Sequence, residues 1–524
     1  MLLPLLLLTL PAAVQAQFTY TTNNGAITIT GYTGPGGAVT IPSTINGLPV
    51  TGIGDSAFEG CTSLISVTVP RSVTSIGNYA FYDCYSLTNV TIGTNVTSIG
   101  ESAFGVCTSL TSITIPDSVS DIGGGAFGFC TSLTSVTIPD SVTNIGGGTF
   151  AYCYSLTNVT TGANVTSIGD STFLLCTRLT SITFPNSITS IGNYAFAYCH
   201  SLPRCAIPNS VTNIGDSAFC NCTSLTSITI PDNVITIGET AFLTCTNLTR
   251  VNIPNSVRSI GDEAFEYCTS LTNVIIGNSV TNIGWYAFSS CPSLTAITVD
   301  PSNSCYGSAD GVLFNKTQTA LIQYPQGRVG GYNIPNSVTT IEADAFSECA
   351  NLTSVIIPDS VTSIGDSAFI YCGNLTNVTI PNGVTSIGDS AFCYCHSLTG
   401  VHFIGNPPNL VGLHVFDDDN NATVYYLPGI TGWGTTFGGL PTALWSLPYP
   451  AILNNSPSFG VGTNGFNFII SWATNVSVVV EACTNLANPL WQPVATKTLS
   501  GGTARFSDPE WTNYPARFYR LRSL

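Results

Sequence analysis

The sequence has few charged residues and very few basic ones. Charged residues make up 8% of its 524 residues, and 12 Lys plus Arg stand against 28 Asp plus Glu, a formal net charge of −16. Nucleic acids and anionic membrane surfaces bind clustered basic side chains, so this balance argues against both as partners. Beyond residues 1–16, no apolar run is long enough to suggest a membrane span.

Recognisable catalytic motifs are also missing. The sequence contains no metalloprotease HExxH motif, phosphate-binding P-loop, nucleophile elbow or paired-carboxylate motif. A recurring Ile-Gly-Asp, as at Asp170 and Asp216, could suggest calcium, but a carboxylate just before a helical segment is more simply an N-cap. We therefore expect no enzyme activity, no cofactor and no metal site. Only four histidines occur: His200, His396, His402 and His414.

The sequence is dominated by one repeat. The unit Ala-Phe-x-x-Cys, with Thr replacing the Ala in two copies, recurs every 23 residues from Phe58 to Phe288, and after an interruption it resumes for three more copies. A fixed period of this length predicts a solenoid in which stacked coils share a continuous core. The repeat phenylalanines are Phe58, Phe81, Phe104, Phe127, Phe150, Phe173, Phe196, Phe219, Phe242, Phe265, Phe288, Phe346, Phe369 and Phe392.

Each repeat contains two groups of apolar residues. The first, seen at Leu110, Ile113 and Ile115, fits a short strand, and Pro116 ends it because proline cannot donate to a ladder. In the second, the repeat Phe and Cys are three residues apart, the spacing of one face of a helical turn. The pattern predicts a short parallel strand plus a short helical or 3₁₀ segment in every repeat.

The N-terminal residues 1–16 form a short apolar run that ends with small residues at Val14 and Ala16. This pattern predicts a secretory signal peptide cleaved before Gln17, and the alternative is a buried N-terminal helix. The signal implies a secreted or cell-surface-associated protein, with no membrane insertion after the signal is removed.

The nineteen cysteines allow three interpretations. Exported proteins commonly use such numbers for disulfides, but a cysteine at an inward repeat position behaves as a small hydrophobe. A buried reduced ladder, bridges between adjacent coils, and metal binding are the alternatives. Fourteen cysteines lie three residues after a repeat phenylalanine: Cys61, Cys84, Cys107, Cys130, Cys153, Cys176, Cys199, Cys222, Cys245, Cys268, Cys291, Cys349, Cys372 and Cys395.

The consensus AFxxCxSLTSITIPxSVTSIG closely resembles the BspA-like leucine-rich repeat family of surface and secreted proteins, over roughly residues 18–440. The resemblance implies a leucine-rich-repeat solenoid that takes part in adhesion or protein recognition, and it brings no catalytic site. Residues 17–53 resemble the family's capping coils, and residues 54–440 hold the repeats. The interruption DGVLFNKTQTALIQYPQG reads as a hairpin inserted at about residues 305–331.

The period is lost after residue 440. Residues 441–458 include a Pro/Asn/Ser-rich stretch that reads as a linker. Residues 459–524 contain short strands separated by turn residues, and they resemble a small fibronectin-III-like β-sandwich with Trp472 and Trp491 as core aromatics. The expected architecture is therefore a solenoid with a small C-terminal all-β sandwich.

The residues between the inward positions of each strand must point outward, because side chains alternate across a sheet. Most are Ser or Asn followed by Thr, and they form two polar ladders that are either a solvated face or a ligand-binding face. Arg204, Arg250 and Asn252 replace small residues on that face, and His402 takes a Thr position. These departures from the repeat reflect either drift between copies or selection for binding a ligand. The candidate binding residues are Ser112, Thr114, Ser135, Thr137, Arg204, Arg250, Asn252 and His402.

Three functions remain open. The leading hypothesis is an exported, non-enzymatic binding or adhesion protein that recognises an extracellular protein or glycan through the sheet face of the repeats. The second is a structural spacer that displays the C-terminal domain, and the third is an ice-binding face formed by the threonine ladders.

Overall fold

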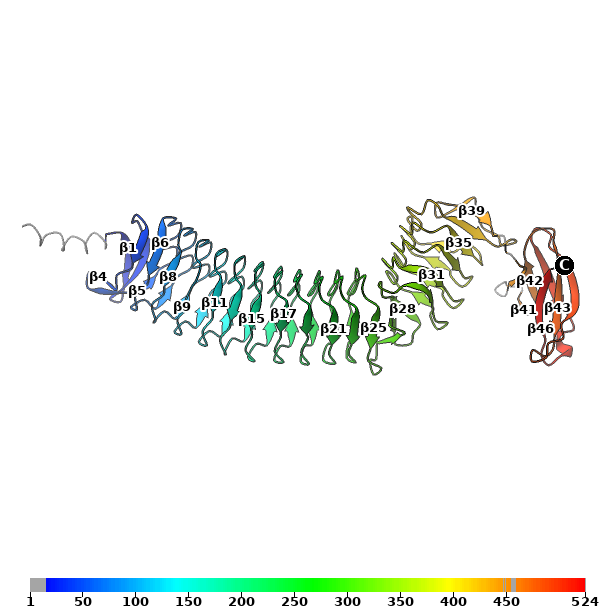
Figure 1. Ribbon diagram of the computed structural model, residues 1–524, viewed down its shortest axis with the longest axis horizontal. Coiled ribbons are helices and arrows are strands. Elements are labelled where there is room, and N and C mark those ends of the chain that lie inside the picture. Colours follow the sequence, from blue (N-terminus) through cyan, green and yellow to red (C-terminus); the bar gives the residue numbers. More distant parts are fainter. Residues whose placement is uncertain (1–15, 446, 448, 454–458, 524) are drawn as a thin grey trace, which may run out of the picture. The chain divides into compact units, whose positions relative to one another are not determined.

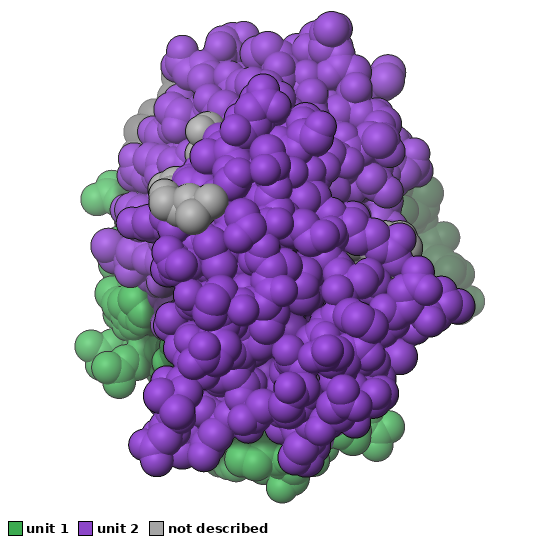
Figure 2. Space-filling view, turned by 90° about the vertical axis from the view of Figure 1, so that its right-hand side faces the viewer, with its two compact units in different colours: residues 1–311 green, residues 312–524 purple. Residues whose placement is uncertain are grey.

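The computed structural model describes residues 16–445, 447, 449–453 and 459–523, and residues 1–311 and 312–524 form two compact units (Figure 2). Residues 1–15 of the predicted signal peptide lie outside the described residues. Within the described part, no helix has the length and hydropathy that a membrane span requires.

Residues 16–311 form a stack of coils that lie side by side, and each regular coil contributes short parallel strands (Figure 1). One series, from the Ile-Gly half of the repeat, forms a continuous sheet. Its strands are β1 (Phe18–Asn23), β2 (Ala26–Tyr32), β4 (Thr44–Ile45), β5 (Leu48–Ile53), β7 (Ser75–Ile76), β9 (Ser98–Ile99), β10 (Asp121–Ile122), β12 (Asn144–Ile145), β14 (Ser167–Ile168), β16 (Ser190–Ile191), β18 (Asn213–Ile214), β20 (Thr236–Ile237), β22 (Ser259–Ile260) and β24 (Asn282–Ile283).

The second series comes from the leucine-containing half of the repeat, as the sequence predicts, and divides into four shorter sheets. In chain order its strands are β3 (Gly37–Thr40), β6 (Leu64–Thr68), β8 (Asn89–Thr91), β11 (Ser135–Thr137), β13 (Asn158–Thr160), β15 (Ser181–Thr183), β17 (Arg204–Ala206), β19 (Ser227–Thr229), β21 (Arg250–Ile253), β23 (Asn273–Ile276) and β25 (Ala296–Val299). Strand β26 (Tyr306–Ala309) follows them in the chain and is not part of these four sheets.

The coils stack in register. Ile122 pairs with Ile145, and Ser135 pairs with Asn158, so each residue lies opposite the one 23 positions later. Side chains at equivalent positions therefore form columns that run along the stack.

The segment around the repeat phenylalanine is a series of turns and not a helix. The Phe104 amide donates to the Ala126 oxygen of the next coil at 2.8 Å, whereas the Gly105 amide donates to the Ser102 oxygen three residues back at 2.9 Å. Ser102 and Val106 have φ values of 49° and 60°, in the left-handed region. A helix would use all these amides internally, so left-handed residues turn every second amide towards the neighbouring coil. Apart from this difference, the predicted solenoid is confirmed.

Phenylalanine and cysteine columns fill the core. Phe104 and Phe127 are fully buried, and their rings stack with centroids 5.5 Å apart and planes 1° apart. The Cys130 thiol donates to the Phe104 oxygen at 3.2 Å, and the same bond recurs in most coils. All nineteen cysteines are free thiols, and burial raises the pKa of Cys130 well above its usual value. The thiols therefore serve as small apolar side chains that also bind a carbonyl.

Residues 312–444 continue the coil pattern within the second unit. Here β27 and β28 pair antiparallel within the region for which a hairpin is expected. Residues 312–444 contribute strands to two sheets. To the first they contribute β27 (Val312–Asn315), β28 (Ala320–Gln323), β30 (Thr340–Ile341), β32 (Ser363–Ile364), β34 (Ser386–Ile387) and β36 (Asn409–Leu410). The second contains β29 (Gly330–Asn333), β31 (Leu352–Ile356), β33 (Asn377–Ile380), β35 (Gly400–Phe403), β37 (Thr423–Tyr426), β38 (Thr436–Phe437) and β39 (Leu440–Leu444).

The predicted all-β C-terminal sandwich is confirmed. One sheet contains β40 (Ala451–Leu453), β41 (Gly460–Gly462), β42 (Gly465–Ser471) and β45 (Thr503–Asp508), and the other contains β43 (Ser477–Cys483), β44 (Gln492–Thr498) and β46 (Phe518–Ser523). Its one helix, η1 (Trp511–Asn513), is also the only helix in the described part of the chain. The two sheets enclose a small core of Phe468, Ile470, Val478, Val480, Leu499 and Phe506.

Asp419 stands where the cysteine ladder would continue. Phe416 stacks on Phe392 with centroids 5.6 Å apart, and Asp419 follows Phe416 by the same three residues that separate the other phenylalanines from their cysteines. Asp419 is 2% exposed. Burial, together with the nearby Asp418 and Asp417 carboxylates, raises the pKa of its carboxyl to about 7.

The thiol ladder predicts how many cysteines react in the folded protein. Only Cys61 and Cys305 are not buried, so a thiol reagent applied to the native protein is expected to modify about two of the nineteen cysteines. All nineteen should react after denaturation without a reductant. A denatured count well below nineteen would show that ladder cysteines form disulfides.

The Asp419 carboxyl predicts a pH-dependent stability. Its folded-state pKa of about 7 exceeds the ordinary 3.8, so the free energy of unfolding is expected to fall as pH rises from about 4 to about 7. Above that range, Asp419→Asn should stabilise the protein by roughly 2–4 kcal/mol. Urea unfolding across this pH range measures the effect, with the exposed Asp359→Asn as control. Equal pH profiles for wild type and Asp419→Asn would contradict the prediction.

Candidate functional site

The outward side chains of the leucine-half strands form two columns. Ser135 pairs with Asn158, which pairs with Ser181, and Thr137, Thr160 and Thr183 are aligned in the same way two positions further along the strands. Ser112 joins the first column through an isolated bridge to Ser135. Both columns are exposed, so the expected hydroxyl ladders are present on the surface.

A second set of threonines, one position before the first column, is used by the fold itself. The Thr134 hydroxyl donates to the Thr111 oxygen at 3.1 Å, and the Thr157 hydroxyl donates to the Thr134 oxygen at 3.0 Å. The side chains of Thr114 and Thr137 have no hydrogen-bond partner within the described residues. Their hydroxyl groups are therefore available to a ligand, whereas those of Thr134 and Thr157 connect coils.

Arg204 and Arg250 stand in the first column on either side of the Ser227 coil. Arg204 pairs with Ser227, and Arg250 begins a strand 23 residues further on, so the two arginines are about 10 Å apart at the usual strand spacing. Both are exposed, and neither forms an ion pair within the described part of the chain. Asn252 is also exposed and faces outward from the same strand as Arg250. The structure therefore brings these three candidates onto one face.

His402 belongs to the other unit and joins an aromatic cluster there. Its ring stacks on Tyr425 with centroids 5.0 Å apart and lies 4.6 Å from the Trp445 ring. The His402 ring also lies above Gly400, where an added Cβ would come within 2.6 Å of it. Burial lowers the pKa of His402, so the ring is a neutral hydrogen-bonding group at neutral pH.

Tyr425 and Trp445 are site residues that were not identified from the sequence. Tyr425 follows His402 by one repeat and pairs with it, so the 23-residue period contained the signal. Trp445 follows a coil that is shorter than 23 residues, since Val424 pairs with Thr442. The 23-residue period therefore does not predict the position of Trp445.

The aspartates of the Ile-Gly-Asp motif have a structural role. Asp170 accepts the Asn193 amide at 2.7 Å, and Asp216 accepts the Glu239 amide at 2.9 Å. Each carboxylate therefore caps a backbone amide of the next coil, instead of a helix in its own coil.

The fold and the polar strand face define a leucine-rich-repeat protein. The model of the BspA type leucine-rich repeat region, in six copies, matches residues 38–157, 104–222, 143–250, 189–309 and 323–434. The chain belongs to this family, as its consensus predicts.

Solved structures of other leucine-rich-repeat proteins are similar to this chain. A leucine-rich repeat protein from Bacteroides ovatus is 26% identical over 78% of this chain and 93% of its own, with a TM-score of 0.53. A leucine rich cell surface protein from Faecalibacterium prausnitzii is 30% identical over 78% of this chain and 93% of its own, with a TM-score of 0.27. The T. pallidum leucine-rich repeat protein is 35% identical over 36% of this chain and 89% of its own, with a TM-score of 0.34. The comparison with curated proteins gave no match.

The aromatic cluster predicts a measurable change in His402. Trp445→Ala uncovers the imidazole, so the pKa of His402 should rise towards its usual value. An NMR titration of the histidine ring protons measures this shift. Trp285→Ala, at an exposed tryptophan in residues 1–311, is the control and should leave the His402 pKa unchanged. An unchanged pKa in Trp445→Ala would show that other groups bury the ring.

Proposed function

We propose that this chain is an exported, non-enzymatic binding or adhesion protein that holds an extracellular protein or glycan on the outward strand face of its coils. The observation that supports this most directly is the exposed face that carries Arg204, Arg250 and Asn252. Its arginines lack ion-pair partners within the described residues, and hydroxyl groups without partners extend along the same series of strands. Arginine in such a setting binds carboxylate or sulfate groups with two parallel hydrogen bonds.

The scarcity of charge elsewhere strengthens this assignment. A protein with 12 basic residues and a net charge of −16 gives an acidic ligand few other places to bind. Two arginines about 10 Å apart, with Ser227 between them, match two acidic groups on a glycan or on a protein loop. Family membership supports a role in recognition, and the signal-like residues 1–16 support export.

His402 and its aromatic neighbours form a separate candidate surface in residues 312–524. Sugar rings present apolar faces that pack on aromatic side chains, and His402 and Trp445 add hydrogen-bonding groups beside such a face. A glycan ligand therefore suits this cluster better than an acidic protein loop does.

The test is a binding screen of the full chain against a glycan array and a panel of extracellular proteins. In the double variant Arg204→Ser and Arg250→Ser, affinity for the ligand found should fall by about tenfold or more, because each arginine loses a charge-assisted hydrogen bond. The matched control is Arg71→Ser with Arg258→Thr, which removes the same charge at exposed positions outside the leucine-half strands. Equal losses in both double variants, or no ligand at all, would refute binding through this face.

A further inference from the structure

A small pocket lies between the last coil and the C-terminal sandwich, both of which belong to residues 312–524. Its volume is about 190 Å³, and its walls include Pro428 and Trp445 from the coil and Trp472, Thr474 and Gly502 from the sandwich. This is the volume of about six water molecules at ~30 Å³ each. Pockets for drug-sized ligands run from about 300 to 1,000 Å³, so this one has room for a single ring.

Hydrogen bonds hold the walls of the pocket in place. The fully buried Ser471 hydroxyl donates to the Pro428 oxygen at 3.2 Å, and the Trp472 indole N–H donates to the Leu447 oxygen at 2.8 Å. The Trp472 amide donates to the Gly502 oxygen at 3.0 Å. A Cβ added to Gly502 would lie 2.4 Å from Pro428, so glycine permits this close approach. The pocket is therefore formed before a ligand arrives, and a ligand has little to order on binding.

The pocket combines aromatic surface with unused polar groups. Trp445 and Trp472 are half-buried, so each indole presents part of its ring to solvent. The Trp445 indole N–H and the exposed Thr474 hydroxyl have no hydrogen-bond partner within the described residues. An apolar side chain bound here would take these polar groups out of water without giving them a partner. A sugar ring offers C–H faces to the indoles and hydroxyl groups to the polar atoms.

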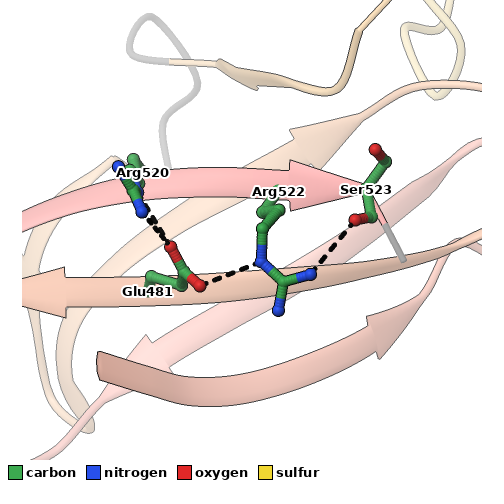
Figure 3. Close-up of polar contacts among 4 residues, drawn as sticks. All are labelled: Glu481, Arg520, Arg522 and Ser523. Carbon is green, nitrogen blue, oxygen red and sulfur yellow. Dashed lines mark hydrogen bonds and ion pairs between the residues drawn. The ribbon is translucent and has the colours of Figure 1, made fainter. Parts of the chain in front are cut away.

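No charged side chain lines the pocket. The charged groups of the sandwich pair with one another elsewhere: Glu481 accepts hydrogen bonds from Arg520 at 2.8 Å and from Arg522 at 3.0 Å (Figure 3). Arg517 likewise lies 3.0 Å from Asp508. A charged ligand would lose water in the pocket without gaining a counter-charge, so the chemistry of the lining selects an uncharged ligand.

The pocket continues the aromatic cluster around His402. Trp445 lines the pocket, and its ring also lies 4.6 Å from the His402 ring, which stacks on Tyr425. A chain of sugar units can therefore place one ring in the pocket and the next over the cluster.

We propose that this pocket binds one uncharged hexopyranose ring of a glycan against the Trp445 and Trp472 indoles. The Trp445 N–H and the Thr474 hydroxyl bind the hydroxyl groups of that ring. The inference rests on the glycan surface proposed for His402 and names the sugar unit that is bound beside it. It is independent of Arg204 and Arg250, which belong to the other unit.

The experiment records ¹⁹F NMR spectra of the full chain, whose six tryptophans are replaced by 5-fluorotryptophan. Single Trp→Phe variants assign the signals. Methyl β-D-glucopyranoside and methyl β-D-galactopyranoside are the probes, and at least one should shift the Trp445 and Trp472 signals saturably, with a Kd of roughly 1–10 mM for so small a ligand. The other four signals should stay in place. Methyl β-D-glucuronide, which adds a carboxylate to the glucoside, should bind at least about tenfold more weakly.

Ala473→Tyr fills the pocket from an exposed position and should weaken binding by about tenfold or more. The matched control is Ala487→Tyr, at an exposed position of the sandwich outside the pocket, and it should leave the shifts unchanged. The four remaining tryptophan signals report whether each variant is folded.

No saturable shift with either neutral glycoside, equal weakening by the two tyrosine variants, or equally tight binding of the glucuronide would each overturn the proposal. A shift of Trp445 without Trp472 would also overturn it, while leaving a glycan surface at His402. The shifts should persist in the Arg204→Ser, Arg250→Ser double variant, so a failure of the arginine face is distinguishable from a failure of this pocket.

Discussion

The structure depends on coil-to-coil hydrogen bonding at a fixed step of 23 residues. The Phe104 amide reaches the oxygen of Ala126 in the next coil, and hydroxyl and thiol groups add further bonds between coils. Each coil can satisfy its buried backbone only if its neighbour has the same length and the same turns. This requirement explains why the period does not slip over eleven consecutive copies, and why residues with left-handed backbone recur at equivalent positions.

The same register converts sequence positions into surface columns. A residue that faces outward in one coil lies opposite its equivalents in the coils before and after it, as Ser135, Asn158 and Ser181 do. Columns whose polar groups connect coils cannot change without loss of a bond, whereas columns with free polar groups can. Arg204 and Arg250 stand in the first column, where Ser181 donates to the Asn158 side-chain oxygen at 2.7 Å. Neither arginine forms such a bond within the described residues, and both keep the backbone pairing of their strands, so these substitutions alter the surface without disturbing the stack.

The periodic part of the fold could be predicted from the sequence, and its local geometry could not. The period identified the solenoid, the leucine-half strands and the buried Phe and Cys columns. It did not distinguish the turns from a helix, because residues three apart share a face in both. Asp419 escaped notice because Phe416 follows Phe392 by 24 residues, which hides its place in the cysteine column. The pocket that Trp445 and Trp472 line depends on how the sandwich packs on the last coil, and such contacts leave no pattern in the sequence.

The basic residues are concentrated in the C-terminal sandwich, so its surface is more charged than the surface of the coils. Five of the 12 basic residues lie between positions 497 and 522: Lys497, Arg505, Arg517, Arg520 and Arg522. The coils are held together by hydroxyl, thiol and backbone hydrogen bonds, which salt affects little. In the sandwich, the Glu481 and Asp508 clusters place charges close together, and their exposed members are subject to screening. Salt is therefore expected to screen the exposed charges of the sandwich and the few arginines of the coil face, while the stack of coils that presents those arginines stays intact.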